Sequence, residues 1–114
     1  MTLSEKQRLF GKNVVRLLAY IGQQDYSFTF GEALRTQEQA DIYAKSGKGI
    51  THSLHIKKLA IDLNIFSPGG IFLIEVKDLE KFGKYWESLN ADNTYGGFWH
   101  LKPDADHYEM NDNL

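Results

Sequence analysis

The amino-acid sequence predicts an α+β fold in which a small antiparallel sheet is flanked by helices. Three observations predict this class: an N-terminal stretch with a helical period, a run of alternating aromatic and hydroxyl residues, and a strong turn between two apolar segments. The expected order is helix, strand, helix, two strands, helix and strand, which is typical of an α+β domain. The length of 114 residues predicts a single domain, 1–114.

The N-terminal third is expected to contain a helix and a strand. Between Ser4 and Ile21, apolar residues recur every three or four positions, which predicts a helix with one buried stripe. Ser4 followed by Gln7 fits a capping box, and Gly22 marks the expected end of the helix. In residues 26–30, Tyr, Phe and Phe alternate with Ser and Thr, as in a strand with one buried face.

The middle of the chain is expected to form a helix followed by two paired strands. Residues 36–45 are predicted to be helical, and a glycine-containing loop follows them. Residues 59–66 alternate between two faces, which predicts a strand. Residues 67–70 read Ser-Pro-Gly-Gly, a strong turn signal, so residues 71–76 are expected to pair back as the second strand of a hairpin.

The C-terminal third is expected to end the sheet. Residues 78–89 carry Leu, Phe, Tyr and Trp side chains at helical spacing, which predicts a helix. Residues 90–97 are rich in Asn and Gly and are interpreted as a loop. Residues 107–110 are expected to form a short final strand.

Composition excludes several classes of function. The chain has no cysteine, so any bound metal must be held by histidine and carboxylate side chains. A net charge of -2 gives no basic footprint for nucleic acid. No segment approaches the roughly 20 apolar residues of a membrane span, and residues 1–13 lack the apolar run of a signal peptide. We therefore expect a protein made and kept in a cytoplasm, without membrane insertion, and a monomer by default.

Two histidines and an aspartate suggest a metal site. His55, Asp62 and His107 supply three ligands for zinc and leave a fourth position open, as catalytic zinc sites do. The odd separation of His55 and Asp62 requires His55 on a turn before the strand that carries Asp62. Asp62 lies between Ile61 and Leu63 and needs a partner for its charge, which a cation would supply. For this pair alone, a capped histidine and a salt-bridged aspartate are the commoner interpretation.

The acidic segment before and after His107 offers a general base. Asp104, three residues before His107, is placed to take a proton from a metal-bound water. Asp106 and Glu109 are competitors for this role, and Glu109 can instead orient the His107 ring as a hydrogen-bond acceptor. Alone, such an acidic stretch is more often a solvated turn.

These residues resemble a known family, the zinc D-Ala-D-Ala carboxypeptidases and L-alanyl-D-glutamate endopeptidases, whose fold is shared with the hedgehog signalling domain. The family pattern is S-x-H-x-x-G-x-A-x-D followed by D/E-x-x-H. The matching residues are Ser53, His55, Ala60 and Asp62, then Asp104 and His107, with Arg35 before a glutamine-bearing helix upstream. The resemblance spans roughly residues 28–110. The chief departure is Lys58, where the family usually carries glycine.

The resemblance implies zinc-dependent hydrolysis of peptidoglycan. It implies that His55, Asp62 and His107 hold Zn²⁺ and that Asp104 activates water. It also gives roles to three further residues. Arg35 would bind a substrate carboxylate or polarise the scissile carbonyl, Ser53 would contact substrate or steady the loop, and Trp99 would line the cleft unless it belongs to the core. His52 and His100 are interpreted as bystanders.

The expected substrate is a peptidoglycan stem peptide. A small chain with no wall-binding module and no export signal is similar to phage endolysins of the L-alanyl-D-glutamate type, which stay in the host cytoplasm until a membrane pore releases them to the periplasm and cell wall. A D-Ala-D-Ala carboxypeptidase or dipeptidase is the nearest alternative. A non-catalytic, zinc-stabilised domain that binds wall peptide or protein is a third. The donor set suits zinc but also accepts manganese or cobalt.

Overall fold

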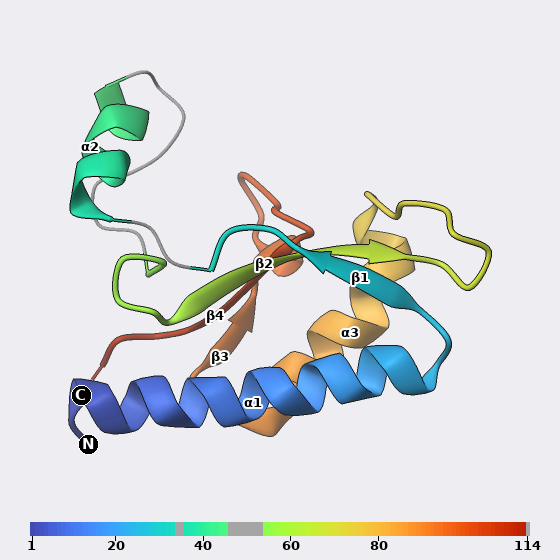
Figure 1. Cartoon of the computed structure of the whole chain (residues 1–114), viewed down its shortest axis with the longest axis horizontal. Helices are drawn as coiled ribbons and strands as arrows, with labels where there is room; N and C mark the ends of the chain where they lie inside the picture. Colours follow the sequence, from blue (N-terminus) through green and yellow to red (C-terminus); the bar gives the residue numbers. More distant parts are fainter. Residues whose placement is uncertain (34–35, 46–53, 114) are drawn as a thin grey trace.

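A four-stranded antiparallel sheet with helices packed on it forms the framework of the protein, as the predicted α+β class requires (Figure 1). The computed structural model describes residues 1–33, 36–45 and 54–113. In chain order the elements are α1 (Leu3–Gln23), β1 (Ser27–Phe30), α2 (Gln37–Lys45), β2 (Ala60–Phe66), α3 (Val76–Leu89), β3 (Asn93–Tyr95), the 3-10 helix η1 (Gly96–Phe98) and β4 (His107–Met110).

The strand order is β1-β2-β4-β3, and every neighbouring pair is antiparallel. Strand β4, the last in the chain, therefore lies in the middle of the sheet beside β2. Their register pairs Asp62 directly with His107. Helices α1 and α3 pack against each other, with α1 below the sheet and α3 behind it in this view, whereas α2 lies on the side away from α1 (Figure 1).

The hydrophobic core fills the space between the sheet and helices α1 and α3. Each helix presents an apolar stripe, and alternate residues of the strands face it. The fully buried side chains include Leu17, Ile21, Leu63, Ile65, Phe82, Trp86, Tyr95, Tyr108 and Met110. Because strand side chains alternate between the two faces, Asp62, His107 and Glu109 lie on the opposite face from this core. The core thus leaves one face of the sheet for polar chemistry.

Helix α1 begins one residue before and ends two residues after the expected limits. Its capping box is formed by Thr2 and Glu5, not by Ser4 and Gln7: the Thr2 hydroxyl accepts from the Glu5 amide, and the Glu5 carboxylate accepts from the Thr2 amide. The helix continues past Gly22 and stops before Asp25, whose φ of 64° lies in the left-handed region. Although α1 has 21 residues, neither it nor any other helix in the described ranges is apolar over a length that could span a bilayer.

Two expectations in the second half are wrong. The turn at residues 67–70 is present, but residues 71–76 form no strand: one isolated bridge joins Phe66 to Phe72, and Val76 already begins α3. Conversely, the predicted loop at residues 90–97 contains strand β3, which pairs with β4. A strand of three residues is too short to show the two-residue period.

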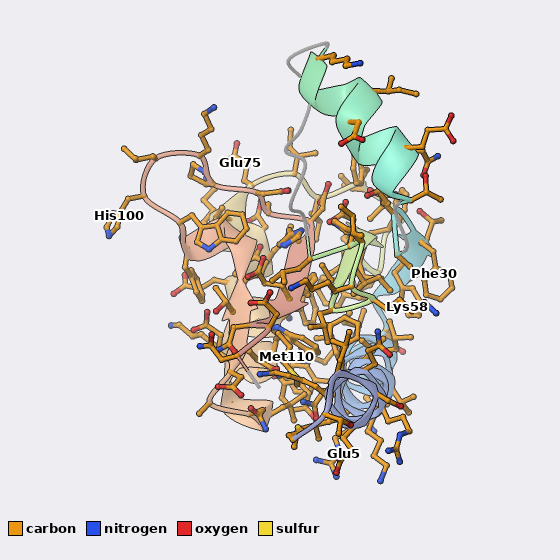
Figure 2. The ribbon with its side chains drawn as sticks, turned by 90° about the vertical axis from the view of Figure 1, so that its left-hand side faces the viewer. Glu5, Phe30, Lys58, Glu75, His100 and Met110 are labelled. Carbon is orange, nitrogen blue, oxygen red and sulfur yellow. The ribbon has the colours of Figure 1, made fainter. Side chains whose placement is uncertain are left out.

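The expected buried face of β1 is also only partly present. The Phe28 side chain is half-buried, but Phe30 is 63% exposed at the outer side of the sheet (Figure 2). Strand β1 lies at the edge of the sheet and pairs only with β2 among the described strands. Its other edge, beyond which no described strand lies, is open.

Lys58 adopts a backbone conformation that favours glycine. Its φ is 58°, in the left-handed region, where the backbone strain of a residue with a side chain costs about 1–2 kcal/mol of folding free energy. Glycine removes this strain. It also has more conformational freedom in the unfolded chain, which lowers the stability of the folded state by up to about 1 kcal/mol. We therefore expect Lys58→Gly to raise the free energy of unfolding by about 0.5–1 kcal/mol, measured by urea denaturation. Lys57→Gly is the matched control and should lower it; destabilisation by Lys58→Gly would show that the strain is absent.

Candidate metal centre

His55 lies on a tight turn immediately before β2, as its spacing from Asp62 predicts. In this turn the Lys57 and Leu59 amides both donate to the carbonyl of Leu54, at 3.1 and 3.0 Å. The Gln7 side chain of α1 donates to the carbonyl of Lys57 at 2.8 Å and ties the turn to the core helix. The His55 ring is 3% exposed. A hydrogen-bonded turn that is tied to α1 therefore fixes the position of this buried imidazole.

Asp62 and His107 face each other across β2 and β4, and His55 approaches the same carboxylate from the turn. Asp62 Oδ1 lies 3.1 Å from His107 Nδ1 and 3.4 Å from His55 Nε2. One potential ligand atom from each residue lies within 4.8 Å of the other two. Both rings are buried, whereas the Asp62 side chain is 27% exposed. The group can therefore hold a metal ion and remains accessible from one side.

Each imidazole also has a carboxylate near its other nitrogen, at hydrogen-bond distance for His107 and at a longer ion-pair distance for His55. Glu109 Oε1 lies 2.7 Å from His107 Nε2, so Glu109 takes the orienting position that its place on the strand suggested. Glu32 Oε1 lies 3.8 Å from His55 Nδ1. The sequence offered no signal for Glu32, because no spacing pattern connects the end of β1 to the turn that carries His55.

The electrostatics of the group fit a divalent cation. Burial opposes ionisation of Asp62, but hydrogen bonds from His107 and His55 outweigh it and lower its pKa to about 2. Burial likewise disfavours the charged His107 ring, but its bonds to Asp62 and Glu109 raise its pKa to about 9. Two imidazoles and an ionised carboxylate form a donor set that suits zinc. A metal ion would replace the proton that His107 otherwise carries.

These pKa shifts predict how the stability of the chelator-treated protein depends on pH. The Asp62 pKa lies below its usual 3.8, so its contribution is complete above about pH 4 and disappears as the pH falls through 2. The His107 pKa lies above its usual 6.5, so its contribution is complete below about pH 6.5 and is lost as the pH rises through 9. Calorimetry in EDTA should show a melting temperature that declines between pH 6.5 and 9.

Zinc should remove that decline, because metal binds the deprotonated His107 ring. The His107→Ala variant should lack the decline even in EDTA. An equal decline with zinc present would contradict the assignment of His107 to the ligand group.

Asp104 lies on the turn that leads into β4. Its amide donates to the carbonyl of Gly96 at 3.0 Å, and its own carbonyl accepts from the His107 amide at 3.2 Å. A Cβ at residue 96 would lie 2.8 Å from the Asp104 carbonyl oxygen and 2.9 Å from His107 Cβ, so only glycine allows η1 to pack this closely. The turn therefore holds Asp104 next to a proposed ligand while its side chain stays exposed.

Asp106 also lies near the ligand group. Burial, with the negative charges of Asp104 and Asp62, raises the pKa of Asp106. Its amide donates to Asp104 Oδ1 at 3.4 Å. The two aspartates therefore remain distinct candidates for the base, whereas the Glu109 carboxylate is bound to His107.

Comparison with known proteins supports the fold. No protein-family model matches the sequence, and comparison with curated proteins gives no match. Among solved structures, the chain is similar to the crystal structure of Serratia marcescens L-Ala D-Glu endopeptidase ChiX, with a TM-score of 0.69 and 20% sequence identity over 95% of this chain and 85% of the other. The chain has the fold of this endopeptidase. The resemblance predicted from the sequence is therefore confirmed at the level of the fold.

Of the remaining residues named from the sequence, Trp99 and His100 belong to the described part of the chain. Trp99 is 38% exposed, and its ring centroid lies 5.1 Å from that of His107, so it borders the ligand group and does not belong to the core. His100 is exposed and points away from the protein at the end of its loop (Figure 2). Arg35, Ser53 and His52 lie outside the described residues.

Proposed function

We propose that this chain is a phage endolysin, a zinc-dependent peptidase that cleaves the L-alanyl-D-glutamate bond of the peptidoglycan stem peptide. The observation that carries the proposal is the convergence of His55, Asp62 and His107, distant in sequence, around one accessible point. Three protein ligands with an open position are typical of catalytic zinc sites, whereas structural sites are closed by four. The name of the Serratia marcescens protein, an L-Ala D-Glu endopeptidase, supports the choice of bond.

Each candidate side chain has its own role in amide hydrolysis. When bound, zinc supplies Lewis acidity that polarises the carbonyl and lowers the pKa of a water ligand to about 7. Asp104 accepts the proton of the attacking water and returns it to the leaving amine. Arg35 donates to a substrate carboxylate or to the developing oxyanion with its fixed fork of donors. Trp99, beside His107, gives the substrate a flat surface to lie on, and Ser53 contacts the substrate or steadies its loop.

The position of Asp104 favours catalysis over simple binding. A zinc ion that only stabilised a binding domain would need no base beside it and would prefer a fourth protein ligand. Here the backbone of Asp104 is hydrogen-bonded to the backbones of Gly96 and of His107, a proposed ligand, and its side chain is exposed. In this proposal the enzyme stays in the host cytoplasm as a monomer and reaches the wall after release.

Incubation of the purified protein with peptidoglycan tests the proposal. With zinc present, new amino groups should appear, and mass spectrometry of the fragments should show a new N-terminal D-Glu. Release of free D-Ala would instead identify a D-Ala-D-Ala carboxypeptidase. Peptidoglycan that remains intact with zinc at several pH values would reject the enzyme and favour a binding domain.

A further inference from the structure

The backbone after β1 carries a local irregularity beside the proposed ligands. Beyond Phe30, the amide of Gly31 donates to the Asp62 carbonyl at 2.9 Å, but the amide of Asp62 donates to the carbonyl of Glu32 at 2.8 Å. Two residues thus oppose one residue of β2, as in a β-bulge. Bulges of this kind bend a strand and redirect a side chain, often next to an active site.

Gly31 is the residue that makes this close pairing possible. A Cβ at residue 31 would lie 3.1 Å from Asp62 Cβ and 3.2 Å from the Asp62 carbonyl oxygen. Contacts this short would push the two backbones apart by a few tenths of an ångström. With glycine, the backbone of Glu32 stays hydrogen-bonded to Asp62, and its side chain reaches His55.

The contact between Glu32 and His55 is on the edge of the ring that does not face Asp62. Glu32 Oε1 lies 3.8 Å from Nδ1 of His55, whereas Nε2 of the same ring lies 3.4 Å from Asp62 Oδ1. Glu32 is therefore not a member of the group that shares one metal position, which contains His55, Asp62 and His107. Its side chain is 27% exposed and the His55 ring is buried, so water screens this charge only in part.

We propose that Glu32 is a positioning residue, which holds the proton of His55 on Nδ1 and thereby directs the Nε2 lone pair toward the metal. A carboxylate on one imidazole nitrogen fixes both the tautomer and the ring orientation. Glu109 has a corresponding place at His107: its Oε1 lies 2.7 Å from Nε2 while Asp62 Oδ1 lies 3.1 Å from Nδ1, whereas Glu32 lies at the longer distance of 3.8 Å from His55 Nδ1. The two imidazoles thus use opposite nitrogens, each selected by its own carboxylate. This inference rests on the metal site of the proposed function.

Zinc affinity and the tautomer of His55 test the inference without any measurement of peptidase activity. Competition with a chromophoric chelator should show that Glu32→Ala binds zinc about 10–100-fold more weakly, the usual effect of removing such a partner. Glu32→Gln keeps an acceptor but loses the charge and should fall between Glu32→Ala and wild type. Glu38→Ala, which removes an exposed carboxylate from the first turn of α2, is the matched control and should bind zinc as wild type does.

In ¹⁵N spectra of histidine-labelled, zinc-loaded protein, His55 should be protonated on Nδ1 and coordinated through Nε2. Zinc affinity of Glu32→Ala within twofold of wild type, or coordination of His55 through Nδ1, would overturn the proposal. If circular dichroism shows that Glu32→Ala does not fold, the zinc affinity of Glu32→Gln becomes the test. A wild-type zinc affinity of Glu32→Gln would then overturn the proposal. A wild-type protein that binds zinc but leaves peptidoglycan intact rejects the peptidase alone and leaves the result on Glu32 standing.

Discussion

Replacing Asp104 with alanine is expected to lower the kcat of peptidoglycan cleavage by about 10²–10⁴-fold, the usual contribution of a positioned proton acceptor. Zinc content should stay at the wild-type level, because Asp104 lies outside the group formed by His55, Asp62 and His107. Its side chain is exposed, so the variant should also keep its thermal stability. Steady-state release of amino groups and elemental analysis of the same preparation measure the two quantities together.

The neighbouring carboxylates provide the controls for this prediction. Asp106→Asn and Glu109→Gln change the charge of the two competing candidates with little change in shape. If Asp104 is the base, Asp104→Ala loses kcat but keeps its zinc. Neither Asp106→Asn nor Glu109→Gln should show this combination. A near wild-type rate in Asp104→Ala would contradict the assignment, and a large loss in Asp106→Asn would transfer the role to that residue.

Replacing His107 with alanine is expected to abolish both zinc binding and activity. In the proposed site the His107 ring is one of three ligands, and its Nδ1 lies 3.1 Å from Asp62 Oδ1. Even residues that only orient metal ligands contribute about 10–100-fold to affinity, so loss of a ligand should weaken zinc binding by more than about 100-fold. The measurements are zinc stoichiometry after dialysis and amino-group release from peptidoglycan.

His100→Ala is the matched control for this variant. His100 is an exposed histidine on the loop before β4, and its side chain points away from the rest of the protein (Figure 2). It should retain one equivalent of zinc and full activity. One equivalent of zinc in His107→Ala would show that His107 is not a ligand, whatever the effect on turnover.

The amino-acid sequence predicted the helices and the central strands well because their patterns are long. Helices α1 and α3 each repeat their apolar residues at helical spacing over more than ten residues. Strand β2 alternates between buried and partly exposed residues along most of its length. The spacing of His55 and Asp62 also correctly placed one on a turn and the other in a strand. The fold class follows from such local patterns.

The errors arose where tertiary contacts decide the local structure. Residues 71–74 look like a strand by composition, but Ile71 and Ile74 are exposed, and α3 begins two residues later. Strand β3 exists because β4 lies next to it and because Asn93 donates to the Trp86 carbonyl at 2.9 Å. Neither partner can be read from residues 90–97 alone.

In the candidate site, too, local sequence predicts some features and tertiary contacts determine the others. A motif identifies the types of ligand, but the register that places Asp62 opposite His107 is a property of the folded sheet. Glu32 was missed for this reason: its contact with His55 depends on a bulge between β1 and β2. Lys58, in contrast, was noticed as a departure from the family, and its left-handed φ explains why glycine is usual there.

A crystal structure of the zinc-loaded protein, with anomalous scattering recorded at the zinc edge, tests the metal site most directly. We expect one zinc ion bound by His55 Nε2, Asp62 and His107 Nδ1, with metal–nitrogen distances of about 2.0–2.1 Å and a solvent molecule in the remaining position. An anomalous peak elsewhere, or a fourth protein ligand that closes the coordination sphere, would contradict a catalytic zinc centre in this protein.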